Sequence, residues 1–395
     1  MRLIGPTFHP KYATLLHISS PGHSDPARQC DADFTRLPLV RLVTDFHLVS
    51  QQTGEEKCMQ DALIEAEKGS EKTSPNPAVG AVLVLRNRII ARGRHRLAGS
   101  DHAEVDCLRK LNDPIPAEAV LYVTLEPCST RGRTAPCANY IIQRGIRRVV
   151  IGAVDPNPKH QGRAIKLLRA GGVEVSTGVL KDECTRLNEA FNKWIVSGEP
   201  FVIAKCGMSL DGYLTRPPGE TRWLTSELSR THAHKLRALV DAIIVGAETI
   251  RRDNPRLTVR KGSRSTQPWR VILTKSGRLP RNATVFRDSE KERTLVYRNQ
   301  SLRAVLRDLG RREITSVLFE GGGDVLSQAL DQRLIDKVQI YIAPLFTGGG
   351  VLAFEGKGAG STQQSLRLDS PRYERIGQDI CITGYPKKAT DFPTE

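Results

Sequence analysis

Short apolar runs alternate with amphipathic segments along most of the chain, and this alternation limits the possible folds more than any other feature. In the first half the strand-like runs lie at 78–85, 89–93, 119–125, 147–154 and 173–175, and the helix-like segments at 57–69, 102–111, 137–145 and 162–172. Strands that alternate with helices are typical of an α/β domain in which helices cover both faces of one sheet. We therefore predict a three-layer α/β domain.

The same alternation resumes after a break at "SGEP", residues 197–200. Strands are predicted at 200–210, 241–247, 269–275, 314–322 and 336–344, and helices at 227–240, 301–310 and 323–334. This pattern indicates a second α/β domain. We expect an extension over residues 1–54, a first domain over 55–198 and a second domain over 199–388. The extension is rich in His, Pro and Ser and lacks the features of a secretory signal. We expect a disordered tail or a start codon placed too far upstream, with an organellar transit peptide as the alternative.

Composition narrows the possible partners. The net charge of +16 suits nucleic acid, membrane headgroups or phosphorylated small molecules, although an ordinary solvated surface explains it equally well. The sequence has no block of five or six like charges and no basic run interleaved with aromatics, so we expect no nucleic-acid partner. It has no apolar run of membrane-spanning length, so no membrane is expected either. Eight scattered cysteines are typical of reduced thiols in the cytoplasm.

Four residues of the first half have the types and order of a catalytic zinc site. His102 and Glu104 open the helix-like segment "HAEVDCL", and Cys128 and Cys137 each follow a proline farther along. One His and two thiolates supply three zinc ligands and leave a fourth position open, as in catalytic zinc sites. Zinc lowers the pKa of water to about 7, and a carboxylate such as Glu104 can then move the proton to a leaving amine. The set predicts hydrolytic deamination.

Each part of this pattern is weak alone. A lone H-x-E is more often a pair on the solvent face of a helix, and a lone P-C is equally uninformative. The ordered set at strand–helix junctions is much more specific. The spacing between the cysteines is C-x8-C, whereas nucleoside, tRNA and DNA deaminases usually carry P-C-x-x-C. This difference argues against a nucleic-acid deaminase.

Longer motifs in both halves resemble the family of bifunctional riboflavin-biosynthesis deaminase–reductases. These motifs are "NPAVGAVLV", "HAEVDCL", "VTLEPCSTRGRTAPC" and "DPNP" in the first half, and "KCGMSLDG", "GETRWLTS", "LRALVDAIIVGAETIRRDNPRLTVR" and "EGGGDVL" in the second. The resemblance covers about residues 55–385. It implies an N-terminal cytidine-deaminase-like α/β/α domain followed by a dihydrofolate-reductase-like reductase domain, with zinc and NADPH as cofactors. It also implies a phosphorylated pyrimidine substrate and a homo-oligomer.

The resemblance also implies roles for particular residues. In the first half Glu104 is the proton shuttle, the zinc ligands are His102, Cys128 and Cys137, and Asn76 contacts the pyrimidine. The implied substrate residues of the reductase are Lys205, Thr221, Arg237, Leu257, Arg260 and Glu320. Its implied cofactor residues are Trp223, Thr249, Asp253, Gly321, Gly322 and Gly323.

From the residues alone the second half is less specific. It has no G-x-G-x-x-G after a strand, and the glycine run of "FEGGGDVL" fits a plain turn as well as a phosphate site. Arg237 could equally be a solvated charge, Trp223 a core residue, and Asp211 only a turn residue.

The sequence departs from the family pattern at two places. Thr130 stands where the family usually has His, and "KHQGRA" follows "DPNP" where the family usually has V-x-G-x-G. Both departures lie on the substrate side in the family. They leave open an alternative in which the deaminase substrate site has decayed and only the reductase works.

Overall fold

The computed structural model describes residues 53–111, 114–130, 136–215, 223–260 and 266–388. Residues 1–52 of the predicted extension therefore lie outside the described residues. Helix α1 (Gly54–Glu67) begins at the last residue that was assigned to the extension. Its start is fixed by a capping box, because Thr53 Oγ1 accepts from the Glu56 amide at 3.2 Å and Glu56 Oε2 accepts from the Thr53 amide at 2.8 Å.

The first sheet has the strand order β2-β1-β3-β4-β5. Its strands are β1 (Gly80–Leu85), β2 (Arg88–Arg94), β3 (Val120–Leu125), β4 (Arg148–Ala153) and β5 (Glu174–Thr177). β1 pairs antiparallel with β2 and β3, and the β3–β4 and β4–β5 pairs are parallel. The strands predicted at 78–85 and 89–93 thus form the β1–β2 hairpin.

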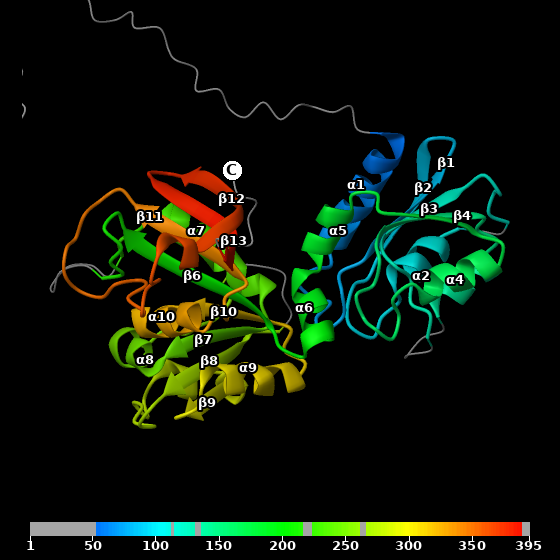
Figure 1. Ribbon diagram of the computed structural model, residues 1–395. Helices are drawn as coiled ribbons and strands as arrows, with labels where there is room; N and C mark the ends of the chain where they lie inside the picture. The colour runs from blue at the N-terminus through cyan, green and yellow to red at the C-terminus, as the bar shows by residue number, and fades with distance from the viewer. Residues whose placement is uncertain (1–52, 112–113, 131–135, 216–222, 261–265, 389–395) are drawn as a thin grey trace, which may run out of the picture. The chain divides into compact units, whose positions relative to one another are not determined.

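Helices cover both faces of this sheet (Figure 1). One face packs on α1 and α5 (Lys181–Leu187), and the other on α2 (Ala103–Leu108), α3 (Cys137–Gln143) and α4 (Arg163–Ala170). Residues of β1 alternate between the two cores: Leu83 faces α2, α3 and α4, whereas Val82 faces α1 and α5. The predicted three-layer α/β fold is confirmed.

The second sheet has the order β12-β13-β11-β6-β10-β7-β8-β9. Its strands are β6 (Phe201–Ser209), β7 (Ala242–Gly246), β8 (Trp269–Thr274), β9 (Thr294–Arg298), β10 (Ser316–Glu320), β11 (Lys337–Ala343), β12 (Leu366–Ile376) and β13 (Asp379–Lys388). The six strands from β11 to β9 run parallel, and the β12–β13 hairpin adds two antiparallel strands at the β11 edge.

Helices again lie on both faces of the second sheet. One core contains α9 (Leu302–Arg311) and α10 (Gly323–Asp331), and the other contains α7 (Glu227–Leu239) and α8 (Ala247–Asp253). Helix α6 (Glu189–Ser197) ends at Gly198, just before β6. Short 3-10 helices occupy Thr284–Phe286, Lys291–Arg293 and Thr362–Gln364. None of the helices in the described part of the chain is long and apolar enough to span a membrane.

Candidate active sites

His102 and Glu104 lie at the start of α2, where the chain turns from an extended segment into the helix. His102 is the N-cap residue with extended backbone angles, so its side chain projects from the helix end instead of lying along the helix face. Glu104 is the second helical residue and only 3% exposed. A carboxylate at this depth is not part of a solvated surface pair, so that interpretation of H-x-E is wrong for this chain.

The two cysteines converge on His102 from the neighbouring strand–helix connection. Cys128 follows β3, and Cys137 is the first residue of α3. Their sulfur atoms lie 3.5 Å and 3.3 Å from His102 Nδ1, respectively. The Cys137 and Ala138 amides at the start of α3 donate to the sulfur and carbonyl of Cys128, which fixes the connection against the helix.

These three donor atoms have the spacing of a zinc site. All lie within 4.8 Å of one another. Zinc–sulfur bonds of about 2.3 Å and zinc–nitrogen bonds of about 2.0 Å at tetrahedral angles put N and S atoms about 3.5 Å apart. The observed sulfur–nitrogen distances of 3.3 and 3.5 Å match that value. The residues therefore fit a three-ligand zinc ion with one open position.

The electrostatics suit a metal cation and a nearby proton carrier. The hydrogen bond with Cys137 lowers the pKa of Cys128, so this pair readily holds a negative charge. Interaction with Cys128, and next with Glu104, raises the pKa of His102. Burial, reinforced by the negative charge of Cys128, raises the pKa of Glu104 to about 7. A carboxyl group with such a pKa can both accept and release a proton near neutral pH.

Asn76 is held beside this group by His95, a residue that the sequence analysis did not single out. The buried His95 ring donates from Nδ1 to the Asp101 carbonyl at 3.0 Å, which leaves Nε2 to accept from the Asn76 amide at 3.1 Å. Burial lowers the pKa of His95, in keeping with this neutral tautomer. The ring also packs edge-on against His102, with the centroids 5.2 Å apart. No local pattern marks His95, because its partners come from other segments.

The second candidate site lies where β10 ends beside the middle of β6. Glu320 is the last residue of β10 and pairs in register with Lys205 of β6. Arg237 reaches them from α7, with its Nε 2.8 Å from a Glu320 oxygen, and Lys205 Nζ lies 4.0 Å from the other oxygen. The Arg237 and Glu320 side chains are 9% and 12% exposed, so the interpretation of Arg237 as a solvated charge is wrong.

The charges of Arg237 and Lys205 keep Glu320 ionised. Burial by itself would raise the pKa of Glu320, but Arg237 and Lys205 outweigh it and hold that pKa below the ordinary value. His234, one turn before Arg237 on α7, also faces this group. Burial and the positive charge of Arg237 lower its pKa. His234 was missed in the sequence, because helical spacing alone does not show which face another element covers.

Arg237 also fixes the chain that follows α8. Its Nη1 donates to the Thr258 carbonyl at 3.1 Å. The neighbouring Leu257 is buried and has a φ of 53°, an unusual backbone angle for leucine. Arg260 is exposed. The predicted substrate residues Lys205, Arg237, Leu257 and Glu320 thus belong to one connected group, whereas Thr221 lies outside the described residues.

Four of the six predicted cofactor residues, Thr249 and Gly321 to Gly323, lie at the connection between β10 and α10. Gly321 and Gly322 have φ angles of 107° and 65°, which glycine adopts without strain. A Cβ at Gly321 would lie 3.4 Å from Thr249 Oγ1, so Thr249 borders the glycine loop. Gly323 starts α10 so close to the Leu352 carbonyl that a Cβ there would lie 2.0 Å from its oxygen. The loop is therefore more constrained than a plain turn.

Trp223 and Asp253 are exposed at a distance from the core. Trp223 is 43% exposed and stacks on the Arg230 guanidinium of α7, 4.9 Å from the ring centroid. Its interpretation as a core residue is therefore wrong. Asp253 ends α8. Asp211 acts as a turn residue, since its carboxylate accepts from the Thr347 and Gly348 amides and braces that loop.

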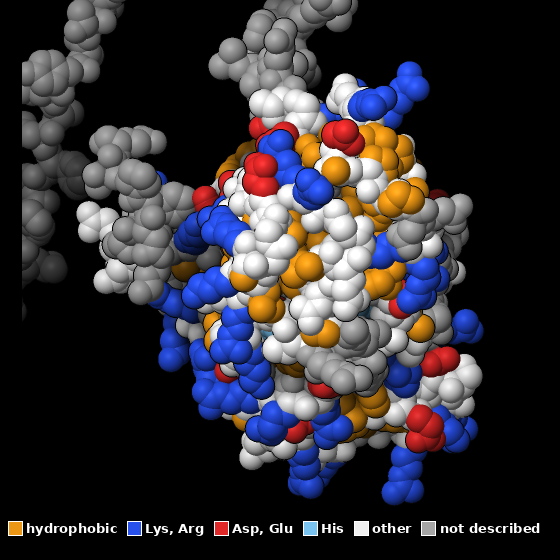
Figure 2. Space-filling view, turned by 90° about the vertical axis from the view of Figure 1, so that its right-hand side faces the viewer, with side chains coloured by type: hydrophobic (Ala, Val, Ile, Leu, Met, Phe, Trp, Pro, Cys, Tyr) orange, Lys and Arg blue, Asp and Glu red, His pale blue; other side chains and the backbone are white. Residues whose placement is uncertain are grey.

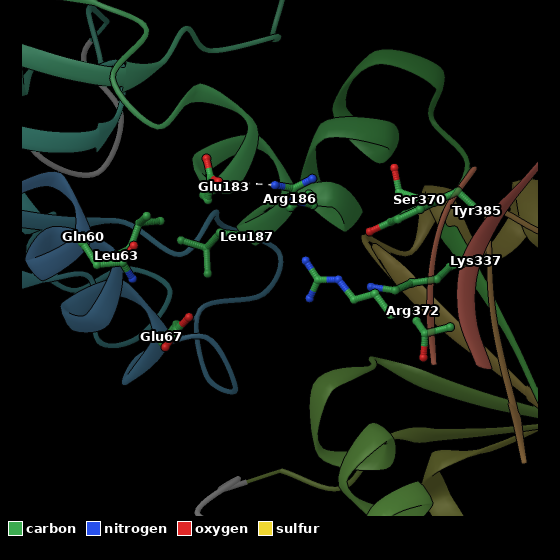
Figure 3. A pocket seen from close by; sticks show the side chains of 11 residues that line it. Gln60, Leu63, Glu67, Glu183, Arg186, Leu187, Lys337, Ser370, Arg372 and Tyr385 are labelled. Carbon is green, nitrogen blue, oxygen red and sulfur yellow. Dashed lines mark ion pairs between the residues drawn. The ribbon is translucent and has the colours of Figure 1, made fainter. Parts of the chain in front are cut away.

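Basic side chains elsewhere are spread over the surface. Figure 2 shows Lys and Arg distributed over much of the face it draws, with Asp and Glu between them. Several form exposed ion pairs, such as Arg186 with Glu183 on α5 at 3.5 Å (Figure 3). Pairs of this kind contribute little to stability.

Comparison with known proteins agrees with the two predicted domain types. Residues 52–153 match the family model of the cytidine and deoxycytidylate deaminase zinc-binding region, and residues 200–382 match that of the RibD C-terminal domain. The riboflavin biosynthesis protein RibD of Aquifex aeolicus is 37% identical over 82% of this chain and 96% of its own length. The RibD of Escherichia coli is 32% identical over 83% of this chain and 98% of its own.

The chain belongs to the RibD family. A crystal form of Acinetobacter baumannii RibD superposes with a TM-score of 0.78 at 33% identity, covering 85% of this chain and 99% of that one. A Thermotoga maritima structure described as a diaminohydroxyphosphoribosylaminopyrimidine deaminase/5-amino-6-(5-phosphoribosylamino)uracil reductase has a TM-score of 0.77 at 34% identity, with the same coverage. RibD proteins unite the two halves seen here, so this chain is a bifunctional deaminase and reductase of riboflavin biosynthesis, with zinc and NADPH as cofactors.

Proposed function

We propose that this chain catalyses two successive reactions on one phosphorylated pyrimidine. The first half removes the 2-amino group of 2,5-diamino-6-ribosylamino-4(3H)-pyrimidinone 5′-phosphate by hydrolysis. The second half reduces the ribosyl chain of the product, 5-amino-6-(5-phosphoribosylamino)uracil, to a ribityl chain. The observation that carries the proposal is the convergence of His102, Cys128 and Cys137 within 4.8 Å, with buried Glu104 two residues from one ligand.

In the deaminase half, His102, Cys128 and Cys137 would hold zinc, which would make water acidic enough to ionise near neutral pH. Glu104 takes the proton from the attacking water and delivers it to the leaving amine, for which its raised pKa is suited. Asn76 contacts the pyrimidine, and His95 fixes the orientation of its amide through the 3.1 Å hydrogen bond. The leaving group departs as ammonia.

In the reductase half, bound NADPH would supply a hydride to C1′ of the ribosyl chain; the bond between C1′ and the ring oxygen would break, and that oxygen would take a proton. Gly321, Gly322 and Gly323 at the start of α10 receive the cofactor, because amides at a helix start attract phosphate. Thr249, Trp223 and Asp253 complete the cofactor side.

The substrate side of the reductase is formed by the connected residues Lys205, Arg237 and Glu320. Exposed Arg260 is free of ion pairs among the described residues and suits the 5′-phosphate. Leu257 and Thr221 are the remaining substrate residues of the proposal.

The proposal is tested with purified protein, by measuring zinc per chain, ammonia released and NADPH oxidised on the diaminopyrimidine. We expect about one zinc per chain and equal amounts of ammonia and oxidised NADPH per substrate consumed. NADPH oxidation that needs the deaminated intermediate to be supplied, without release of ammonia from the diaminopyrimidine, would favour the alternative in which only the reductase works.

We further infer that the enzyme works in the cytoplasm as a homo-oligomer. The supporting observations are its free cysteines, its phosphorylated substrate and its membership of the RibD family. Light scattering coupled to size-exclusion chromatography gives the number of subunits. A monomeric mass at micromolar concentration contradicts the homo-oligomer.

A further inference from the structure

No residue of the loop 155–162, between β4 and α4, has been given a function above. This loop is fixed against the segment that follows β3 and carries Cys128. Its anchor is Glu126, two residues before Cys128 and only 4% exposed. The Glu126 carboxylate accepts three backbone hydrogen bonds, from the amides of Asp155 at 3.2 Å, Gly162 at 2.9 Å and Ala164 at 3.0 Å. These bonds tie both ends of the loop to one buried side chain.

The loop is also ordered by its own hydrogen bonds. Asp155 accepts from the Asn157 amide at 2.8 Å, and the Asn157 carbonyl accepts from the amides of His160 and Gln161 at 2.8 and 2.9 Å. Because its ends and its interior are both fixed, the direction in which the loop presents His160 is determined by the fold.

The side chain of His160 points toward the segment that carries Cys128. Its Nδ1 lies 3.4 Å from the hydroxyl of Ser129, the residue directly after the ligand Cys128. The His160 ring therefore lies beside the segment that carries Cys128. Among the described residues, Ser129 is the only hydrogen-bond partner of the His160 ring, so Nε2 is available to a ligand.

The charge of the loop suits an anion. Lys159 and Arg163 are exposed on either side of the half-buried His160, and the acidic Asp155 is buried behind them. The amides of Gly162 and Ala164 at the start of α4 are already used by Glu126. An anion at this place must therefore be bound by side chains, and His160 contacts Ser129, the residue next to Cys128.

We propose that His160 contacts the 5′-phosphate of the pyrimidine substrate in the deaminase site, on a loop that Glu126 and Ser129 hold in position. This inference rests on the proposed function, which supplies the phosphorylated substrate. It makes His160 a specificity-determining residue that distinguishes the nucleotide from the corresponding nucleoside. Thr130, the other departure from the family pattern, is exposed and has no part in it.

The test compares His160→Ala and His160→Gln with the wild type, by ammonia release from the diaminopyrimidine with and without its 5′-phosphate. Loss of a hydrogen bond to a charged group predicts that His160→Ala lowers kcat/KM for the phosphorylated compound about 10- to 100-fold, mainly through KM. His160→Gln, which keeps an N–H donor, falls between that variant and the wild type. Activity on the dephosphorylated compound changes less than about twofold in both variants.

Lys166→Gln is the matched control, because it removes one exposed positive charge from α4 one turn farther from the loop. It should leave both activities unchanged. NADPH oxidation with the deaminated intermediate checks on the same chain that each variant is folded, and zinc content checks the ligands. Equal losses on both compounds, no loss on either, or loss of zinc in the His160 variants would overturn the proposal. Absence of ammonia release by the wild type would instead contradict the proposed function itself.

Discussion

Replacing Arg237 by Met leaves the buried Glu320 carboxylate without its closest cation. The two side chains are 9% and 12% exposed and their ion pair is 2.8 Å long, so water cannot replace the lost partner effectively. Removing one member of such a pair costs about 3–5 kcal/mol. Lys205, 4.0 Å from Glu320, compensates in part, which points to the lower end of that range. We therefore expect the free energy of unfolding of the second half to fall by about 3 kcal/mol.

Urea unfolding followed by tryptophan fluorescence measures this change, because Trp223 and Trp269 lie in the second half and Trp194 donates to its Gly310 carbonyl. With a slope of about 2 kcal/mol per molar urea, the midpoint should fall by about 1.5 M. Adding Glu320→Gln to Arg237→Met removes the unpaired charge. Because replacing both members of a buried pair is often nearly neutral, the urea midpoint of the double variant should return to within about 0.5 M of wild type. Neither variant should oxidise NADPH at the wild-type rate. A wild-type midpoint for Arg237→Met would refute the buried ion pair.

Three further predictions concern the zinc ligands, the acid stability and the glycine loop. Cys137→Ser should reduce zinc well below one per chain and abolish ammonia release, whereas NADPH oxidation with the deaminated intermediate continues; full zinc content would exclude Cys137 as a ligand. Although burial opposes it, the pKa of Glu320 lies below 4.5 in the folded protein, so its stabilising charge is present above that pH and lost as the pH falls through the lowered pKa. The urea midpoint should therefore fall less between pH 7 and pH 4 in Glu320→Gln than in wild type, and equal falls would contradict this. Gly321→Ala places a Cβ at a φ of 107°, which costs about 1–3 kcal/mol, and should raise KM for NADPH at least several-fold with ammonia release unchanged.

The alternation of apolar runs was sufficient to predict the layers of both halves, but six elements were missed. The β12–β13 hairpin has few buried positions, since β12 is largely exposed, and so it lacks the alternation that marks a strand. Helix α6 has no fully buried residue, and α5 and α8 are only seven residues long. Strand β9 buries a single residue, Tyr297. Such elements are stabilised by their neighbours, which a local pattern does not contain.

The three residues that converge as candidate zinc ligands could be named from the sequence, because ligand chemistry restricts residue types and order. The residues that hold the sites in shape could not be named from the sequence. Glu126 binds three amides of a later segment, and His95 joins Asn76 to the Asp101 carbonyl. Arg237 looks like any charge on an amphipathic helix until β10 and the Thr258 segment are brought against it. Burial by distant segments decides these roles.

The most direct test of the account compares Glu104→Gln with wild type for zinc content, ammonia release and NADPH oxidation. The substitution keeps the size of a side chain that is 3% exposed but removes its ability to carry a proton. We predict about one zinc in both proteins, and ammonia release lowered at least about 100-fold in the variant. NADPH oxidation by the variant should depend on added deaminated intermediate. If Glu104→Gln releases ammonia at the wild-type rate, or if the wild type releases none, the assignment of the first half as a working deaminase with Glu104 as its proton carrier is contradicted.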